Sequence, residues 1–250
     1  MPLFIRGTES GEMIMNLKTI ITLLIGTGAM LVLIAILMKR YEVKIWKSIP
    51  VSFILTVTGT IGTYIWFFVE ASWFGGRSYY GAVFIVPLVF VFIAKLMKIP
   101  YGELMDFCAP AECIMLAIMK YQCLIDGCCG GKVIKIAEDG SEILFPSQII
   151  ELVNAAIVMA VLMSMAFSNK WRGKIYPWYL IIYGVTRFVL NLFRGENTPL
   201  LLGLPAGNLW SLLSIAIGFM WLKDYRIKII KKESTGPVEE IRDFIKDGSD

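Results

Sequence analysis

Apolar residues are concentrated in seven stretches of the chain, and each stretch approaches the length of a membrane-spanning helix. The hydrocarbon layer of a bilayer is about 30 Å thick and a helix rises about 1.5 Å per residue, so a span needs about 20 mostly apolar residues. The predicted helices are Leu17–Met38, Ile49–Val69, Tyr79–Met97, Met105–Ile125, Gln148–Phe167, Ile175–Phe193 and Gly203–Leu222. The pattern therefore predicts an all-α, polytopic integral membrane protein with about seven transmembrane helices.

The first stretch is interpreted as a retained helix rather than a signal peptide. Its apolar run is longer than the usual signal core, and Lys39 and Arg40 follow it without a convincing cleavage site of small residues.

Two of the predicted helices contain charged side chains. These are Asp106, Glu112 and Lys120 in the fourth helix and Arg187 in the sixth. Because polar atoms at membrane depth are costly, we expect both helices to face protein or a water-filled cavity rather than lipid.

The basic residues predict the orientation of the chain. Sixteen lie in or beside the first, third and fifth connections and in the tail, against five in the N-terminal segment and the other connections. The excess of positive charge on cytoplasmic loops places the N-terminus outside and the C-terminus in the cytoplasm. We expect one transmembrane domain over residues 1–222 and a basic, amphipathic cytoplasmic tail over 223–250, with the lipid bilayer as a partner.

Composition narrows the function further. Of 250 residues, 57% are hydrophobic, 18% are charged and none is histidine. A soluble domain is about half apolar and about a quarter charged, so these values argue against one. Without histidine there is no imidazole base, acid or metal ligand. The net charge of +4 is too small to indicate a nucleic-acid partner.

One stripe of polar residues follows the sixth predicted helix. Tyr183, Arg187, Asn191 and Arg194 are spaced by four, four and three residues and so share a helix face. A buried arginine keeps its proton and needs an anion. Two arginines on one face suit a lipid phosphate. The alternative is an internal salt bridge of Arg187 with Glu151 or Glu112.

The segment FPSQIIE (145–151) begins the fifth predicted helix. Pro146 suits a helix start, and Ser147, Gln148 and Glu151 follow within the first turns. These polar residues either cap the helix or place Gln148 and Glu151 in the same cavity as Arg187. The sequence leaves both interpretations open.

All five cysteines lie between positions 108 and 129. The sequence holds no CxxC pair and no histidine to complete a metal site, so no metal is predicted. Cys108, Cys113 and Cys123 are interpreted as small apolar residues within a helix. Cys128 and Cys129 belong to the glycine-rich turn GCCGGK, where backbone amides could approach a phosphate.

Five blocks, taken in order, resemble the motifs of the prolipoprotein diacylglyceryl transferase family. They are GGRSYYG (75–81), MDFCAPAECIMLAIMKYQCLIDGCCGGK (105–132), FPSQIIE (145–151), YGVTRFVLNLFR (183–194) and GLPAGNLWSLLS (203–214). The resemblance covers roughly residues 17–222. It implies a seven-helix, N-out enzyme of the bacterial cytoplasmic membrane, without a cofactor, that moves a diacylglyceryl group from phosphatidylglycerol to the lipobox cysteine thiol of a prolipoprotein.

The resemblance also assigns roles to individual residues. The catalytic candidates are Arg187, which would bind the phosphate, together with Tyr80, Lys120 and Glu151. The substrate-binding candidates are Arg194, Ser78, Gly81, Asp106, Gln148, Asn191, Tyr183 and Asn208. In the resulting scheme a thiolate attacks the glyceryl carbon while the phosphate departs. Tyr80 or Glu151 would remove the thiol proton.

Several motif positions depart from the family pattern. Tyr80 stands where the family has histidine, Lys120 where it has arginine, Cys123 where it has asparagine, and Asn191 where it has glutamate. Lysine keeps the charge but lacks the planar fork that grips a phosphate at two points. A tyrosine with an ordinary pKa of about 10 is a poor base at neutral pH.

These departures motivate two alternatives. One is a divergent paralogue that uses another acceptor, or that binds an anionic lipid without chemistry. The other is a small transporter in which Arg187, Lys120 and Glu112 line a pathway, although no inverted repeat is evident.

Overall fold

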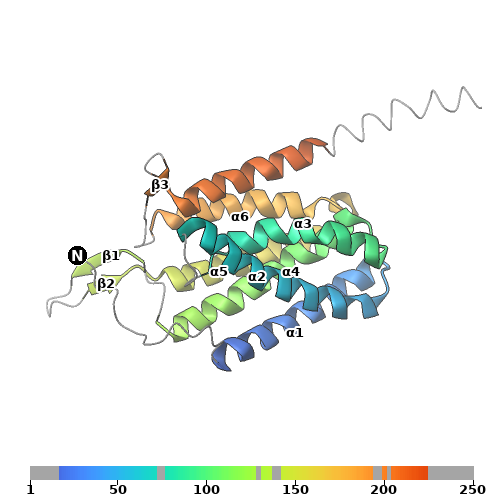
Figure 1. The fold of residues 1–250 in the computed structure, drawn as a ribbon, viewed down its shortest axis with the longest axis horizontal. Coiled ribbons are helices and arrows are strands. Elements are labelled where there is room, and N and C mark those ends of the chain that lie inside the picture. The colour runs from blue at the N-terminus through green and yellow to red at the C-terminus, as the bar shows by residue number, and fades with distance from the viewer. Residues whose placement is uncertain are drawn as a thin grey trace, which may run out of the picture.

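The computed structural model describes residues 17–71, 77–127, 131–136, 142–193, 199–201 and 204–224. Its long helices lie side by side in one bundle (Figure 1). They are α1 (Leu17–Arg40), α2 (Ser48–Ala71), α3 (Tyr80–Met97), α4 (Tyr101–Ile125), α5 (Ser147–Ala166) and α6 (Ile175–Asn191), followed by a last helix over residues 206–224. Two short 3₁₀ turns, η1 (Ile45–Lys47) and η2 (Asn169–Trp171), precede α2 and α6.

Each of the seven predicted helices is present, with ends that differ by a few residues. Five are long and apolar enough to cross a membrane: α1, α3, α4, α5 and the combined segment Ile45–Glu70. The sixth, α6, has 17 residues and is not among these five, and neither is the last helix. A helical membrane protein is thus supported, whereas the count of seven spans and the orientation stay predictions.

Helix α4 occupies the centre of the bundle, where it contacts α1, α3, α5 and α6. Its polar side chains point inward as expected: Asp106 is fully buried, Glu112 is 4% exposed, and the side chain of Lys120 is 13% exposed. The mostly apolar helices around α4 keep these groups away from lipid.

Helices α2 and α3 approach each other closely where two glycines meet. A Cβ atom added to Gly62 would lie 2.7 Å from the carbonyl oxygen of Gly81. Such contacts between small residues allow helix backbones to pack tightly in a membrane. Gly81, a predicted substrate-binding residue, therefore has a packing role in the fold.

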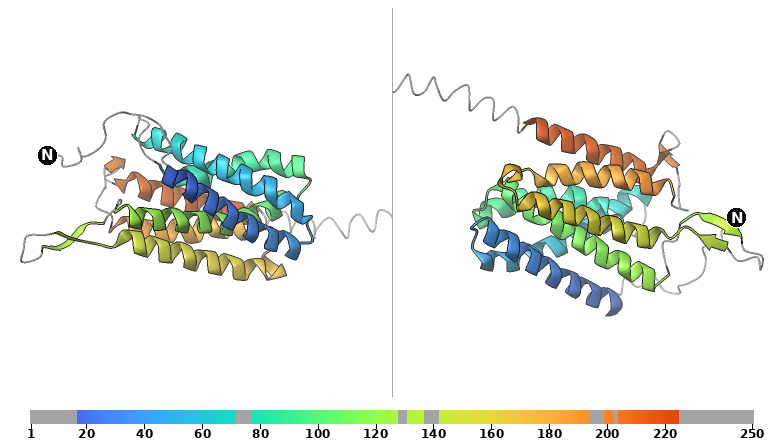
Figure 2. Two further views of the ribbon diagram at one scale, coloured as in Figure 1. Left: turned by 90° about the horizontal axis from the view of Figure 1, so that it is seen from below. Right: turned by 180° about the vertical axis from the view of Figure 1, so that it is seen from behind.

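The fold is all-α, as predicted, and two small antiparallel hairpins accompany the helices. Strands β1 (Val133–Ile136) and β2 (Glu142–Leu144) pair with Val133 opposite Leu144, and β3 (Pro199–Leu201) pairs with β4 (Leu204–Pro205). The β1–β2 ribbon projects beyond the helices (Figure 2). The sequence Val-Ile-Lys-Ile of β1 explains it, because β-branched residues favour strands and this segment lies outside the predicted spans.

The bundle has two distinct ends. We call the end that carries the two hairpins and the start of α3 the hairpin end. The opposite end carries the short connections 41–47, 98–100 and 167–174, and we call it the turn end. Successive helices run between the two ends in alternate directions (Figure 1).

Candidate functional site

One buried carboxylate joins three helices near the hairpin end. Oε2 of Glu151 on α5 lies 2.6 Å from Nζ of Lys120 on α4 and 2.7 Å from Nη1 of Arg187 on α6. The side chains of Glu151, Lys120 and Arg187 are 5%, 13% and 15% exposed. Three of the four predicted catalytic residues thus meet, and the pairing of Arg187 with Glu151 is the internal salt bridge that the sequence offered as an alternative.

This ion cluster has two cations and one carboxylate. Burying charges is tolerable only when they are paired, and Glu151 serves both Lys120 and Arg187. A guanidinium has five N–H donors. Among the described residues, Glu151 is the only carboxylate within ion-pair distance of Arg187. Arg187 therefore retains donors for an anion that enters the bundle.

The start of α5 explains how Glu151 reaches the cluster. Pro146 is the N-cap residue, in keeping with the helix start predicted there, and its own side chain makes no capping hydrogen bond. Ser147 is buried and Gln148 is partly buried in the first turn, while Glu151 points inward one turn later. The structure thus places Glu151 in direct contact with Arg187, while a shared cavity that also holds Gln148 stays a prediction.

Tyr80, at the start of α3, lies beside the ion cluster and is bonded to the last helix. Its hydroxyl is 2.6 Å from Oγ of Ser211, and Ser211 donates its own proton to the carbonyl of Gly207 at 2.7 Å. A serine hydroxyl has one proton, so Tyr80 must be the donor in the Tyr80–Ser211 bond. The ring of Tyr183, a buried member of the α6 stripe, packs 5.8 Å from that of Tyr80.

A second carboxylate near the cluster escaped the sequence analysis. Glu70, in the last turn of α2, accepts a 2.7 Å hydrogen bond from Oγ of Ser78. Ser78 comes two residues before Tyr80, so Glu70 lies at the same end of the bundle as the ion cluster. The sequence signal that could have identified Glu70 is its position, as an acidic residue at the end of an apolar span. Ser78, a predicted substrate-binding residue, thus joins the site through Glu70.

Two asparagines belong to the same end of the bundle. Asn191 is buried at the end of α6 and packs against Gly207, where an added Cβ would lie 2.6 Å from Nδ2 of Asn191. Asn208 is fully buried, and neither atom of its amide has a hydrogen-bond partner within the described part of the chain. Arg194, also predicted to bind substrate, lies outside the described residues.

Asp106 lies at the turn end, away from the other predicted site residues. It accepts hydrogen bonds from the backbone N–H groups of Gly173 and of Ile175, the latter at 2.8 Å, and from the hydroxyl of Tyr41 at 3.1 Å. Lys120 lies fourteen positions further along α4, or about 21 Å of helix away. In this structure Asp106 anchors the start of α6 rather than joining the ion cluster.

The surroundings of Tyr41 support this structural role. Burial, followed by the charge of Asp106, raises the pKa of Tyr41 above its usual range, so its hydroxyl stays a donor. Arg172 stacks on the Tyr41 ring at 4.7 Å and pairs with Glu103 at 2.9 Å. The turn end is therefore tied together by a separate polar network.

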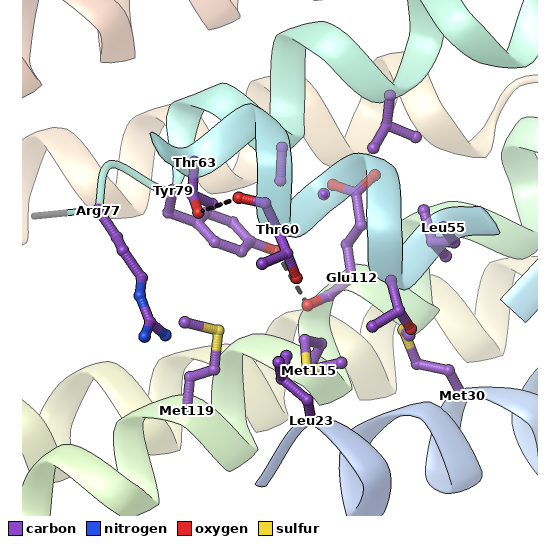
Figure 3. Close-up of a pocket in the computed structure, with 14 residues that line it drawn as sticks. Leu23, Met30, Leu55, Thr60, Thr63, Arg77, Tyr79, Glu112, Met115 and Met119 are labelled. Atoms are coloured by element: carbon purple, nitrogen blue, oxygen red, sulfur yellow. Dashed lines mark hydrogen bonds between the residues drawn. The ribbon is translucent and has the colours of Figure 1, made fainter. Parts of the chain in front are cut away.

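A narrow, mostly apolar cleft opens between α1, α2, α3 and α4 (Figure 3). Leu23, Met30, Leu55, Met115 and Met119 contribute much of its lining, with Arg77 on one side and Glu112 deeper in. Tyr79 donates to the backbone carbonyl of Glu112 at 2.9 Å, and the hydroxyl of Tyr176, which donates to the carbonyl of Val83 at 2.9 Å, lies 3.2 Å from a carboxyl oxygen of Glu112.

The lining of this cleft bears on the transporter alternative. Lys120 and Arg187 are not among the lining residues, although Glu112 is. Glu112 also bonds to tyrosines rather than to either cation. Glu112 is therefore separate from the Lys120–Arg187 pair, which weakens the single charged pathway proposed from the sequence.

The cysteines behave largely as predicted. Cys108 and Cys113 are buried, free thiols within α4, and Cys123 is partly exposed. Cys128 and Cys129 lie outside the described residues.

Fold and site together define a helical membrane protein whose bundle holds a buried cation–carboxylate cluster at one end. Comparison with known sequences gives the family: the model of the prolipoprotein diacylglyceryl transferase family matches residues 20–223. The chain belongs to this family, which consists of membrane transferases. The resemblance seen in the five sequence blocks is thereby confirmed.

Curated relatives carry the same description at low identity. The chain is 28% identical over 176 residues to the phosphatidylglycerol–prolipoprotein diacylglyceryl transferase of Geobacter sulfurreducens, covering 67% of this chain and 66% of that protein. The enzyme of the same name from Polaromonas naphthalenivorans is 28% identical, over 61% of this chain and 60% of that protein. The enzyme from Aeromonas hydrophila is 25% identical, over 51% of this chain and 49% of that protein. The matches thus span about half to two thirds of these relatives.

Proposed function

We propose that this protein transfers the diacylglyceryl group of phosphatidylglycerol to the cysteine thiol of a prolipoprotein lipobox, in the bacterial cytoplasmic membrane. The observation that carries the proposal is the cluster of Arg187, Lys120 and Glu151, which holds two cations inside an otherwise apolar bundle. Family membership supplies the reaction class.

In this proposal the phosphate of the lipid meets Arg187, with Lys120 beside it. Glu151 keeps both cations in place before the lipid arrives, so little reorganisation is needed when charge develops on the leaving phosphate. The thiolate sulfur bonds to the glyceryl carbon, and the bond from that carbon to the phosphate oxygen breaks, releasing glycerol phosphate.

The test is a transfer assay with the full-length purified protein. It would be reconstituted in nanodiscs that contain phosphatidylglycerol labelled in its acyl chains and given a lipobox peptide. The expected result is label on the peptide cysteine. Removing one preorganised donor typically costs about 100- to 1,000-fold in rate, so we expect Arg187→Gln to lower transfer by that factor.

A matched control separates the site from general effects of charge. Arg172→Gln removes an arginine at the turn end, where Arg172 pairs with Glu103, and it should leave transfer close to that of the unmodified protein. Binding of phosphatidylglycerol without transfer would instead favour the non-catalytic, lipid-binding alternative. Full activity of a folded Arg187→Gln variant would refute the proposal.

A further inference from the structure

Glu70 is a carboxylate beside the ion cluster that the proposed function leaves without a role. It lies half-buried in the last turn of α2, at the hairpin end, and its Oε1 accepts the 2.7 Å bond from Ser78. Ser78 comes two residues before Tyr80, and the ring of Tyr80 packs 5.8 Å from that of Tyr183 on α6, the helix that carries Arg187. Glu70 is thus close to the place where the phosphate and the thiol are expected to meet.

Diacylglyceryl transfer needs a group that takes the proton of the thiol, and this chain has no histidine for that purpose. Glu151 is poorly suited. Its negative charge is already matched by Lys120 and Arg187 at 2.6 and 2.7 Å. Protonating it would weaken both ion pairs and leave two buried cations without a counter-charge.

Tyr80 is also poorly suited, because the direction of its hydrogen bond is fixed. Ser211 gives its only proton to Gly207, so the Tyr80 hydroxyl donates to Ser211 and is held as a neutral donor. To accept a proton from the thiol, Tyr80 would first have to lose its own, and its position, 3% exposed, disfavours the charged form.

Glu70 meets neither obstacle. Within the described part of the chain no lysine or arginine lies at ion-pair distance from it. Its neighbours are neutral donors, the Ser78 hydroxyl at 2.7 Å and the Trp210 indole, and both can stay in place whether or not the carboxyl holds a proton. Ser78 fixes the orientation of the carboxylate and leaves lone pairs of both oxygens available.

We infer that Glu70 is the general base of the proposed transferase, accepting the proton of the lipobox thiol as the sulfur attacks. The S–H bond breaks with its proton going to the Glu70 carboxylate, and the S–C bond forms. The C–O bond to the phosphate breaks with its electron pair on the phosphate oxygen. Glu70 then returns the proton to glycerol phosphate or water. This inference rests on the proposed function.

The central experiment compares Glu70→Gln with the unmodified protein in the nanodisc transfer assay. General base catalysis contributes about 100- to 10,000-fold, so kcat/KM at neutral pH should fall by at least about 100-fold. Glu103→Gln makes the same change at the turn end and should retain the full rate. Tyr80→Phe should lower the rate far less than Glu70→Gln.

A peptide with selenocysteine in place of cysteine isolates the proton-transfer step. A selenol is already ionised at neutral pH and needs no base, so it should restore most of the activity of Glu70→Gln. It should not restore Arg187→Gln, whose defect lies at the phosphate. Loss of transfer with both peptides in Glu70→Gln would indicate a merely structural role and overturn the inference.

The pH profile of the unmodified protein gives an independent test that requires no variant. With the thiol peptide, kcat/KM should fall at low pH as a carboxylate becomes protonated, and with the selenol peptide this fall should be absent. Identical profiles would overturn the inference, as would a folded Glu70→Gln with normal thiol transfer. If the unmodified protein transfers nothing to either peptide, the proposed function itself fails.

Discussion

The buried carboxylate of Glu151 is the counter-charge for both cations of the site. Removing one partner of a buried ion pair costs about 3–5 kcal/mol, because the remaining charge is left uncompensated. Glu151 has two partners, Lys120 and Arg187, so its replacement strands both cations. Its importance for stability should therefore exceed that of any exposed pair in this chain.

We predict that Glu151→Gln lowers the free energy of unfolding by about 3 kcal/mol or more, by this mechanism. The measurement is the unfolding midpoint in detergent micelles. Glu103→Gln is the comparison, because its partner Arg172 is 42% exposed. Such surface pairs contribute about 1 kcal/mol or less, so Glu103→Gln should move the midpoint little. Equal shifts for both variants would contradict the importance of the buried cluster.

Helical spacing in the sequence predicts which way a side chain faces, but not which residue it contacts. Arg187 was predicted to face the bundle because it lies on a stripe with Tyr183 and Asn191, both of which are buried. Its partner stayed open between Glu151 and Glu112, because spacing within one helix does not determine which helix lies opposite. Glu70 was missed for the same reason: its neighbours come from other elements.

At the scale of elements, the contact of α2 with α3 depends on Gly62 and Gly81. The Cβ of an alanine at position 62 would lie 2.7 Å from the oxygen of Gly81, a backbone atom that cannot move aside alone. Fitting a side chain into a packed contact typically costs about 1–3 kcal/mol.

We therefore predict that Gly62→Ala lowers the free energy of unfolding by about 1–3 kcal/mol. Gly28→Ala is the matched control, since nothing lies within 4 Å of a Cβ at that position of α1. Alanine favours a helix over glycine by up to about 1 kcal/mol, so Gly28→Ala should be neutral or stabilising. Thermal unfolding of the two variants in the same detergent makes the comparison, and a destabilised Gly28→Ala would show that the packing argument is incomplete.

The beginning of α6 depends on Asp106, which accepts hydrogen bonds from the backbone N–H of Gly173 in the preceding connection and from that of Ile175, the first residue of α6. We predict that Asp106→Ala frees this end of the helix. Hydrogen exchange of the Gly173 and Ile175 amides should accelerate strongly, while amides in the middle of α6 exchange as before. Unchanged exchange at both positions would mean that these bonds do not hold the helix start.

The elements themselves were largely predictable, for a physical reason that does not extend to the hairpins. A span must be apolar over a fixed length, so all seven helices are evident as runs of apolar residues. The β1–β2 ribbon is short, and its pairing depends on two segments meeting outside the bundle. Asp106 illustrates a second limit: its motif suggested substrate binding, whereas the fold places it at the turn end, where it bonds to the α5–α6 connection.

At the scale of the whole molecule, two clusters of polar groups lie at opposite ends of the bundle and have different tasks. The turn end ties connections together through Asp106, Tyr41 and Arg172. The hairpin end gathers Glu151 with its two cations and, nearby, Glu70. Because the turn end holds the connections between helices in place, the charged groups at the hairpin end are available to bind a ligand.

This division makes the orientation in the membrane decisive for the proposed function. A secreted precursor presents its thiol on the outer side, so the hairpin end must face outward, as the distribution of Lys and Arg predicts. We predict that a cysteine at exposed Lys132, beside β1, is labelled in intact cells by a membrane-impermeant maleimide. A cysteine at exposed Lys170, at the turn end, should be labelled only after the cells are opened.

The native cysteines define the background for this labelling experiment. Cys108 and Cys113 are buried and can remain, while Cys123, Cys128 and Cys129 would be replaced by serine. The reverse labelling pattern would place Arg187, Lys120 and Glu70 near the cytosolic leaflet. A thiol arriving on the outer side would then be separated from them by much of the bilayer, so that single result would refute the predicted orientation and the transferase proposal together.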